Sequence, residues 1–244
     1  MARFSFVSGA ATDVGCVRKL NEDAYLDRVD LGLWAVADGM GGHDAGDHAS
    51  QLTVAALGQV AAPTSAATFL AQVKGTLKAA NAELRREAAA RGPGRIIAST
   101  VVSLLVFDQH YACVWAGDSR LYRLRDEVFH QISRDHSHVQ ELIEVQLLSP
   151  EDARHHPYSN VVTRAVGATD TLDLETSHDR LHADDLFLLC SDGLTKTLED
   201  DEIRAVLMRT SLFDVPYALV EMALERRASD NVTVVAVQCR ATET

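Results

Sequence analysis

Apolar runs separated by polar positions predict a series of short β-strands along the chain. These runs occupy residues 4–8, 33–37, 100–107, 111–116, 121–125, 128–132, 186–190 and 232–238. Several are apolar throughout, which is typical of strands that are covered on both faces. We therefore expect sheets that are buried between other layers.

Two other stretches carry apolar residues at helical spacing. The first stripe is Phe69, Val73, Leu77, Ala80 and Leu84, and the second is Val215, Leu219, Met222, Ala223 and Arg226. The second follows Asp214, a predicted N-cap, with Pro216 in the first turn. We expect both stripes to face the core. The uncharged stretch 48–73 is broken by polar residues and a proline, which favours two helices joined by a turn over a membrane span.

The order of these elements favours an α+β fold. Strands, two helices, a run of strands, a polar segment, and then a strand, two helices and a last strand suggest helices packed outside paired antiparallel sheets. No repeat, flexible linker or block of one charge divides the chain, so we expect one domain over residues 1–244. The polar segment 135–160 is predicted to be a partly helical excursion over one end of that domain.

Composition narrows the classes of partner. The 244 residues include 23 Lys+Arg and 35 Asp+Glu, a net charge of −12, which disfavours binding to nucleic acid or to an anionic membrane surface. The four cysteines (Cys16, Cys113, Cys190 and Cys239) are widely spaced and three lie in or beside apolar runs, so we expect reduced, mostly buried thiols in a cytoplasmic protein. The first residues lack the pattern of a secretory signal.

Acidic residues recur where the apolar runs end. Asp38-Gly39, Gly117-Asp118 and Asp192-Gly193 each follow a run, and Asp230 precedes the last one. If neighbouring strands bring these ends together, the repulsion between carboxylates favours a hard divalent cation such as Mg²⁺, Mn²⁺ or Ca²⁺. Each Asp-Gly pair taken singly favours an ordinary turn over a functional site, and three of them at strand ends shift that balance only modestly. The residues alone thus indicate a divalent-metal site of unspecified chemistry.

Two further stretches suggest that the site takes a phosphate. The glycine-rich segment 38–43 can present backbone groups to an anion at a metal. Arg18 lies four residues before the carboxylate pair Glu22 and Asp23, and its planar guanidinium matches phosphate oxygens. A surface ion pair with Glu22 is the alternative interpretation of Arg18.

Taken in order, these motifs resemble one family. They are Thr12-Asp-x-Gly-x-x-Arg18-x-x-Asn21-Glu22-Asp23, Ala37-Asp38-Gly-Met-Gly-Gly-His43-x-x-Gly46, Ser99-Thr100, Gly117-Asp118-Ser119-Arg120, Ser191-Asp192-Gly193-Leu194 and Ser229-Asp230-Asn231-Val232-Thr233. The chain resembles the metal-dependent protein phosphatases of the PPM class, also called the protein phosphatase 2C family, in their bacterial single-domain form.

The resemblance implies a four-layer αββα sandwich with two Mn²⁺ or Mg²⁺ ions at one end. Asp38 would bridge both ions, Asp192 and Asp230 would complete the first site, and Glu22 with the Gly39 carbonyl would serve the second. Asp118 would join Asp192 at a weaker third ion, Arg18 would bind the substrate phosphate, and Asp23 and Asn231 would support these groups. The catalytic set implied by the resemblance is Arg18, Asp38, Asp192 and Asp230.

The activity implied is hydrolysis of phosphoserine and phosphothreonine on proteins by metal-activated water, opposing a bacterial serine/threonine kinase. Phosphorylated proteins would be the partners of a monomeric enzyme. The alternative is a regulatory module of the same fold that binds phosphoproteins with little turnover; its usual mark, loss of Asp38, Asp192 or Asp230, is absent. An unrelated Ca²⁺-binding protein would carry D-x-D-x-D-G loops, and the sequence has none.

The sequence departs from the family pattern at two positions. Met40 stands where eukaryotic relatives commonly have a histidine that is a candidate general acid; metal-bound water or a nearby histidine, with His43 as one candidate, would take that role. Ala98 stands where glycine is common, which we expect to affect packing more than chemistry. The resemblance implies that residues 135–160 occupy the flap, a segment that varies among family members. Their histidines (His136, His138, His155 and His156) either sense pH or bind metal, or are simply exposed or locally hydrogen-bonded.

Overall fold

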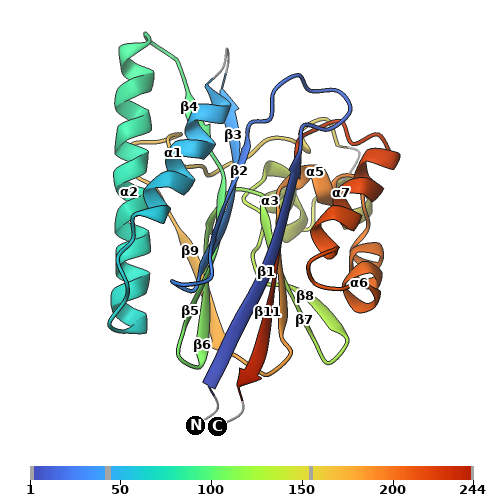
Figure 1. Cartoon of the computed structure of the whole chain (residues 1–244). Coiled ribbons are helices and arrows are strands. Elements are labelled where there is room, and N and C mark those ends of the chain that lie inside the picture. Colours follow the sequence, from blue (N-terminus) through green and yellow to red (C-terminus); the bar gives the residue numbers. More distant parts are fainter. Residues whose placement is uncertain (1–2, 42–44, 154–155, 243–244) are drawn as a thin grey trace.

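The computed structural model describes residues 3–41, 45–153 and 156–242. Two antiparallel sheets face each other, and helices cover both outer faces (Figure 1). The layers therefore run helix, sheet, sheet, helix, and the α+β, αββα prediction is confirmed.

The first sheet has five strands in the order β1-β11-β10-β7-β8. Their bounds are β1 Arg3–Asp13, β7 Arg120–Arg125, β8 Val128–Gln131, β10 Leu186–Cys190 and β11 Val232–Thr242. β1 and β11 pair antiparallel over their whole length, from Arg3 opposite Thr242 to Asp13 opposite Val232. This pairing brings the two ends of the chain together (Figure 1).

The second sheet follows the order β2-β3-β5-β6-β9, with β4 paired to β3. Its strands are β2 Asp23–Arg28, β3 Leu33–Gly41, β4 Ile97–Ser99, β5 Val101–Phe107, β6 His110–Ala116 and β9 Glu175–Arg180. All eight predicted runs form strands, although β5 begins after Thr100 and β8 ends before Ile132.

Three strands were not predicted. β4 spans only three residues, and β9 has the polar sequence ETSHDR at the edge of its sheet. β2 mixes apolar and charged residues in DAYLDR. Backbone pairing with a neighbour, rather than an apolar pattern of their own, places all three in the sheet.

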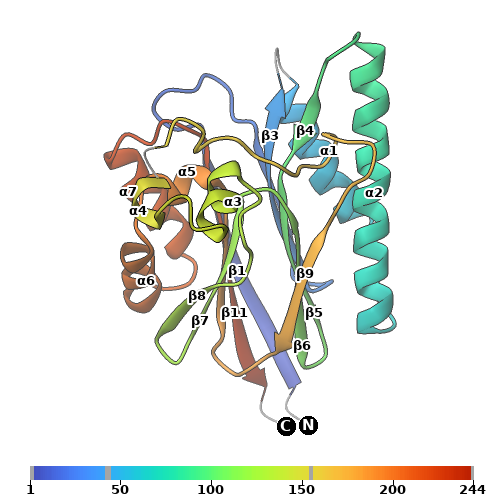
Figure 2. The ribbon, with the colours of Figure 1, turned by 180° about the vertical axis from the view of Figure 1, so that it is seen from behind.

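Apolar side chains fill three layers of core. Between the sheets lie fully buried residues that include Trp34, Leu104, Leu121, Phe187 and Val235. The second sheet is covered by α1 (Gly46–Gly58) and α2 (Ala66–Ala90). The first is covered by α5 (Asp192–Thr195), α6 (Asp200–Arg209) and α7 (Val215–Glu225) (Figures 1 and 2).

The helical predictions are confirmed with two corrections. Every residue of the α2 stripe is buried, and α1 and α2 are the two helices expected over 48–73. In α7, Val215, Leu219 and Ala223 are buried, but the predicted core position Arg226 follows the helix and is exposed, where it pairs with Glu202. Asp214 stands at the N-cap without capping the helix, because its backbone is helical and its carboxylate accepts a hydrogen bond from Ser211 Oγ at 2.5 Å.

The polar segment 135–160 is partly helical, as predicted, and contains α3 (His138–Glu144) and α4 (Pro150–Ala153). Figure 2 shows these two helices on the same side of the molecule as α5. His136 is buried, and its Nδ1 accepts a hydrogen bond from the Gly117 N–H at 3.2 Å, which fits the locally hydrogen-bonded alternative. His155 lies outside the described residues.

The thiols behave as the sequence predicts. Cys113, Cys190 and Cys239 are buried, Cys16 is exposed, and all four are free. Among the described helices, none is both long and apolar enough to cross a membrane.

The α2 face supplies a stability test. Leu77→Ala removes a fully buried side chain between α2 and the second sheet, so we expect a loss of about 2–5 kcal/mol in the free energy of unfolding, measured with urea. The neighbouring exposed Lys78→Ala should change it by no more than about 0.5 kcal/mol. Equal effects of the two substitutions would contradict the assigned face of α2.

Candidate active site

The acidic residues predicted from the sequence gather at one end of the two sheets. Asp38 lies near the end of β3, opposite Asp23 of β2. Asp118 follows β6, Asp192 opens α5 directly after β10, and Asp230 lies just before β11. Asp38 experiences the charges of Asp192, Asp23, Asp118 and Asp230 together, which confirms that strands far apart in the sequence bring these carboxylates close.

Backbone contacts fix the position of Asp38. Its N–H donates to Thr100 Oγ1 at 3.0 Å, and its carbonyl accepts from the Thr100 N–H at 2.8 Å and from Ser99 Oγ at 3.0 Å. Thr100 Oγ1 also shares a hydrogen bond with Ser119 Oγ, next to Asp118. The Ser99-Thr100 motif thus joins two of the strand ends that carry carboxylates.

Glycines allow the segments around Asp38 to approach closely. A Cβ on Gly39 would lie 1.9 Å from the Gly46 carbonyl oxygen, and a Cβ on Gly46 would lie 2.3 Å from Glu22 Oε1. No side chain fits at either position. The start of α1, the end of β3 and the Glu22 carboxylate therefore meet only because both residues are glycine.

Burial and mutual repulsion raise the proton affinity of these carboxylates. Burial, with Asp192 as the main charged neighbour, raises the pKa of Asp118 to about 8. Burial raises the pKa of Asp23 to about 7, against hydrogen bonds from Ser191 and Thr233 that lower it. The pKa of Asp38 is raised well above its usual value by burial and by its carboxylate neighbours, and burial also raises the pKa of Glu22.

The donor set suits a hard divalent cation. Within the described ranges, the buried Oδ1 atoms of Asp23, Asp118 and Asp192 have no hydrogen-bond partner, and carboxylate oxygens are the ligands that Mg²⁺ and Mn²⁺ prefer. A divalent ion would satisfy these oxygens and remove the repulsion between them.

In the part of the chain that the structure describes, no three His, Cys, Asp or Glu side chains form a ready metal cage. Two of the expected ligands are instead held by basic side chains, Asp230 by Arg18 and Asp192 by Lys196.

Arg18 binds Asp230 rather than Glu22, so the surface ion pair considered in the sequence is not the one that forms. The contact is two-pronged: Arg18 Nε lies 2.9 Å from Oδ1 and Nη2 lies 3.0 Å from Oδ2. The Arg18 side chain keeps 52% of its surface exposed, so its guanidinium stands at the rim of the carboxylate group, accessible to a substrate anion.

Asn231 and Asp23 hold the surrounding segments. The Asn231 amide donates to the carbonyls of Val14 and Leu20 at 2.9 and 3.0 Å, and its Oδ1 accepts from the Glu22 N–H at 2.8 Å. Ser191 Oγ donates to Asp23 Oδ2 at 2.7 Å. These contacts fit the supporting roles expected for both residues.

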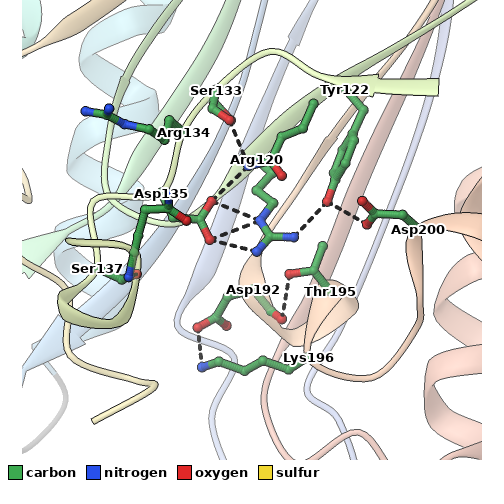
Figure 3. Close-up of polar contacts among 12 residues, drawn as sticks. Arg120, Tyr122, Ser133, Arg134, Asp135, Ser137, Asp192, Thr195, Lys196 and Asp200 are labelled. Atoms are coloured by element: carbon green, nitrogen blue, oxygen red, sulfur yellow. Dashed lines mark hydrogen bonds and ion pairs between the residues drawn. The ribbon is translucent and has the colours of Figure 1, made fainter. Parts of the chain in front are cut away.

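Several polar residues beside the carboxylates had no predicted role. Arg120 forms a two-pronged ion pair with Asp135, with distances of 2.9 Å from Nε to Oδ1 and 2.7 Å from Nη2 to Oδ2, and donates to the Tyr122 hydroxyl (Figure 3). A cavity of about 570 Å³ lies between these groups and the flap; its wall includes Asp118, Arg120, Asp135, Asp192 and Lys196. The spacing of four residues between Asp192 and Lys196 is the signal that could have identified Lys196.

The two residues that depart from the family pattern lie opposite each other on paired strands. Met40 of β3 pairs with Ala98 of β4, and Ala98 is fully buried, as expected for a position that affects packing. His43 lies outside the described residues.

Known proteins share both this sequence pattern and this fold. A sequence model of the family described as protein phosphatase 2C matches residues 17–228. The structure of PppA, a key regulatory component of T6SS in Pseudomonas aeruginosa, is 44% identical with a TM-score of 0.91, covering 99% of this chain and 100% of that one. PhpP of Streptococcus pneumoniae, a protein phosphatase, is 34% identical over 93% of this chain and 94% of its own length.

The serine/threonine protein phosphatase PstP of Mycobacterium tuberculosis is 34% identical over 96% of this chain, which spans 46% of the length of PstP. A structure of the PstP catalytic domain with two manganese ions is 32% identical with a TM-score of 0.88, covering 97% of this chain and 99% of that one. The fold and these comparisons together define a phosphatase of the metal-dependent class. The chain belongs to the protein phosphatase 2C family.

Because the carboxylates at this end are buried and repel one another, we expect the stability of the metal-free protein to depend on pH. The Asp118 carboxyl stays protonated up to about pH 8 in the folded state but ionises near its ordinary pKa of 3.8 when unfolded, so stability falls as pH rises between these values. The substitution Asp118→Asn replaces this carboxyl with an amide, which does not ionise. In EDTA, the melting temperature of the variant relative to that of the unsubstituted chain should therefore rise from pH 5 to pH 8, by at least about 2–4 °C, the shift that corresponds to 1 kcal/mol in a chain of this size.

Asp108→Asn, an exposed change in the turn between β5 and β6, is the matched control and should show no such trend. A melting-temperature difference for Asp118→Asn that is constant across this pH range would contradict the raised pKa of Asp118.

Proposed function

We propose that the chain is a Mn²⁺- or Mg²⁺-dependent enzyme that hydrolyses phosphoserine and phosphothreonine on proteins. The observation that carries the proposal is the set of buried, mutually repelling carboxylates with unpartnered oxygens, in a chain of the protein phosphatase 2C family. PstP, a serine/threonine phosphatase, and its two manganese ions support the same activity and cofactor here.

We assign the metal ligands by position. Asp38 would hold two ions, Asp192 and Asp230 would complete the first site, and Glu22 with the Gly39 carbonyl would serve the second. Asp118 would join Asp192 at a weaker third ion. The support is that all of these groups except the Gly39 carbonyl carry a carboxylate at the same end of the sheets, and that Gly39 itself lies against Gly46 and Glu22.

When bound, the ions supply an activated water as the nucleophile and neutralise charge on the phosphoryl group. The chain's own residues then position the substrate. Arg18 stands at the rim with its guanidinium exposed and exchanges the Asp230 carboxylate for phosphate oxygens, which its planar geometry matches equally well. Thr100 and Ser99 hold the Asp38 backbone in place, so the Asp38 carboxylate needs little reorganisation during the reaction.

We further propose that the enzyme acts as a monomeric single catalytic domain in the cytoplasm, where it opposes a bacterial serine/threonine kinase and acts on that kinase and its targets. Free, mostly buried thiols support the location. One apolar core shared by both sheets supports a single domain.

PppA is a regulatory component, and its 44% identity to this chain supports a regulatory role. A binding module without turnover is not favoured, because PstP and PhpP are protein phosphatases and every expected carboxylate is present.

Metal-dependent turnover is the direct test. EDTA-treated protein should hydrolyse a phosphothreonine peptide only after Mn²⁺ is added. Asp38→Asn should reduce kcat by at least about 100-fold, since loss of even an outer partner of a metal ligand costs 10–100-fold. Asp108→Asn, remote from the carboxylates, should keep the unsubstituted rate. Activity in EDTA, or a near-normal rate for Asp38→Asn, would contradict the proposal.

The role of Arg18 can be separated from that of the metals. Arg18→Lys keeps the charge but loses the two-pronged geometry, so we expect kcat/KM for the phosphopeptide to fall by about tenfold or more, with Mn²⁺ affinity retained. Arg18→Ala should lower kcat/KM further. If neither variant changes kcat/KM, Arg18 does not bind the substrate phosphate.

A further inference from the structure

Lys196 places a positive charge inside the group of carboxylates. It follows α5 directly, and its Nζ forms an ion pair with Asp192 Oδ2 across one turn of helix (Figure 3). The Lys196 side chain is 34% exposed, and that of Asp192 is 12% exposed. The contact is therefore a partly desolvated ion pair at the very residue that opens the helix, and it is stronger than a pair on the open surface.

The same ammonium also influences Asp118. Lys196 is the main cation that acts on the Asp118 carboxyl, which is otherwise surrounded by the negative charges of Asp192 and Asp135. Asp118 is 6% exposed, and Asp118 Oδ1 and Asp192 Oδ1 are both buried without a hydrogen-bond partner. All three residues line the 570 Å³ cavity beneath the flap.

This geometry gives the pair of Asp118 and Asp192 two possible counterions. One is a divalent cation from solution, for which the unpartnered oxygens are suited. The other is the ammonium of Lys196, which is part of the chain and so is present at every metal concentration. A divalent ion can bind both carboxylates fully only after the ammonium moves away, and the flexible four-carbon stem of lysine, together with the adjoining cavity, allows that movement.

We propose that Lys196 is a tethered cation that competes with a divalent ion for Asp118 and Asp192, and so weakens the binding of an ion at this pair. Arg18 does not take this role, because its ion-pair partner is Asp230, which is not a member of the pair formed by Asp118 and Asp192. The inference rests on the proposed metal centre and adds a residue that decides how many ions the centre holds at a given concentration.

The test is a direct count of bound Mn²⁺, without any activity assay. Equilibrium dialysis and isothermal titration calorimetry at pH 7.5 would compare the unsubstituted chain with Lys196→Met, which keeps the apolar stem and removes the charge. We expect the weakest Mn²⁺ site of Lys196→Met to tighten by at least about tenfold, since a unit charge within contact distance is removed. The tighter sites should be retained, with a smaller gain than at the weakest site, because Asp192 also serves the first site.

Two further variants control for charge and for location. Lys196→Arg keeps the cation and should bind Mn²⁺ like the unsubstituted chain. Lys78→Met makes the same change in net charge on the exposed face of α2 and should also have no effect. Adding Asp118→Asn to Lys196→Met should abolish the gain, because it removes one carboxylate of the pair.

Equal affinity of the weakest site in the unsubstituted chain and in Lys196→Met, with the tighter sites intact, would overturn the role of Lys196 and leave the proposed function standing. An equal gain in Lys78→Met would also overturn it, since the effect would then be one of net charge alone. Absence of tight Mn²⁺ sites in the unsubstituted chain would overturn the proposed metal centre itself.

Discussion

The structure depends on one electrostatic constraint: several carboxylates are buried together where the strands of two sheets end. A single carboxylate in water is stable in its ionised form. In this position, burial and repulsion by neighbouring carboxylates raise the pKa of Asp118 to about 8 and that of Asp23 to about 7. The fold tolerates this arrangement because the apolar layers below are extensive and fully packed. The electrostatic repulsion is thus concentrated at one end of the two sheets, where bound cations reduce it. That is the property which a phosphatase using metal ions requires.

Two basic side chains reduce part of the repulsion between the carboxylates without any metal ion. Arg18 neutralises Asp230 at the rim, and Lys196, directly after α5, neutralises Asp192. The two differ in what they can do next. Arg18 is half exposed and its planar guanidinium matches phosphate, which is why we propose that it exchanges its carboxylate partner for the substrate. Lys196 stays beside Asp118 and Asp192, where it adjusts the affinity of the centre for ions. The number of ions bound is therefore set by the chain's own cations as well as by its carboxylates.

Much of the fold followed from local pattern, whereas the contacts of the site did not. The runs that form β3, β5, β6, β10 and β11 are apolar enough to specify buried strands, and the α2 stripe specifies its buried face. β9 has no such pattern, because its pairing with β6 places a polar segment at a sheet edge. The convergence of Asp38, Asp118, Asp192 and Asp230 was expected from strand ends and motifs. The partners of those residues were not: that Arg18 binds Asp230 rather than Glu22, and that Asp192 binds Lys196, depends on tertiary distances which spacing alone does not contain.

The central claim, that buried carboxylates hold protons which metal ions displace, has a direct test. Calorimetric titration of Mn²⁺ into the metal-free protein, repeated in buffers of different ionisation enthalpy, gives the number of protons released for each ion bound. Because burial and its carboxylate neighbours raise the pKa of Asp118 to about 8, the account predicts net release of protons at pH 7 and a smaller release from Asp118→Asn at the same pH. Binding of Mn²⁺ at pH 7 with no proton release would contradict it.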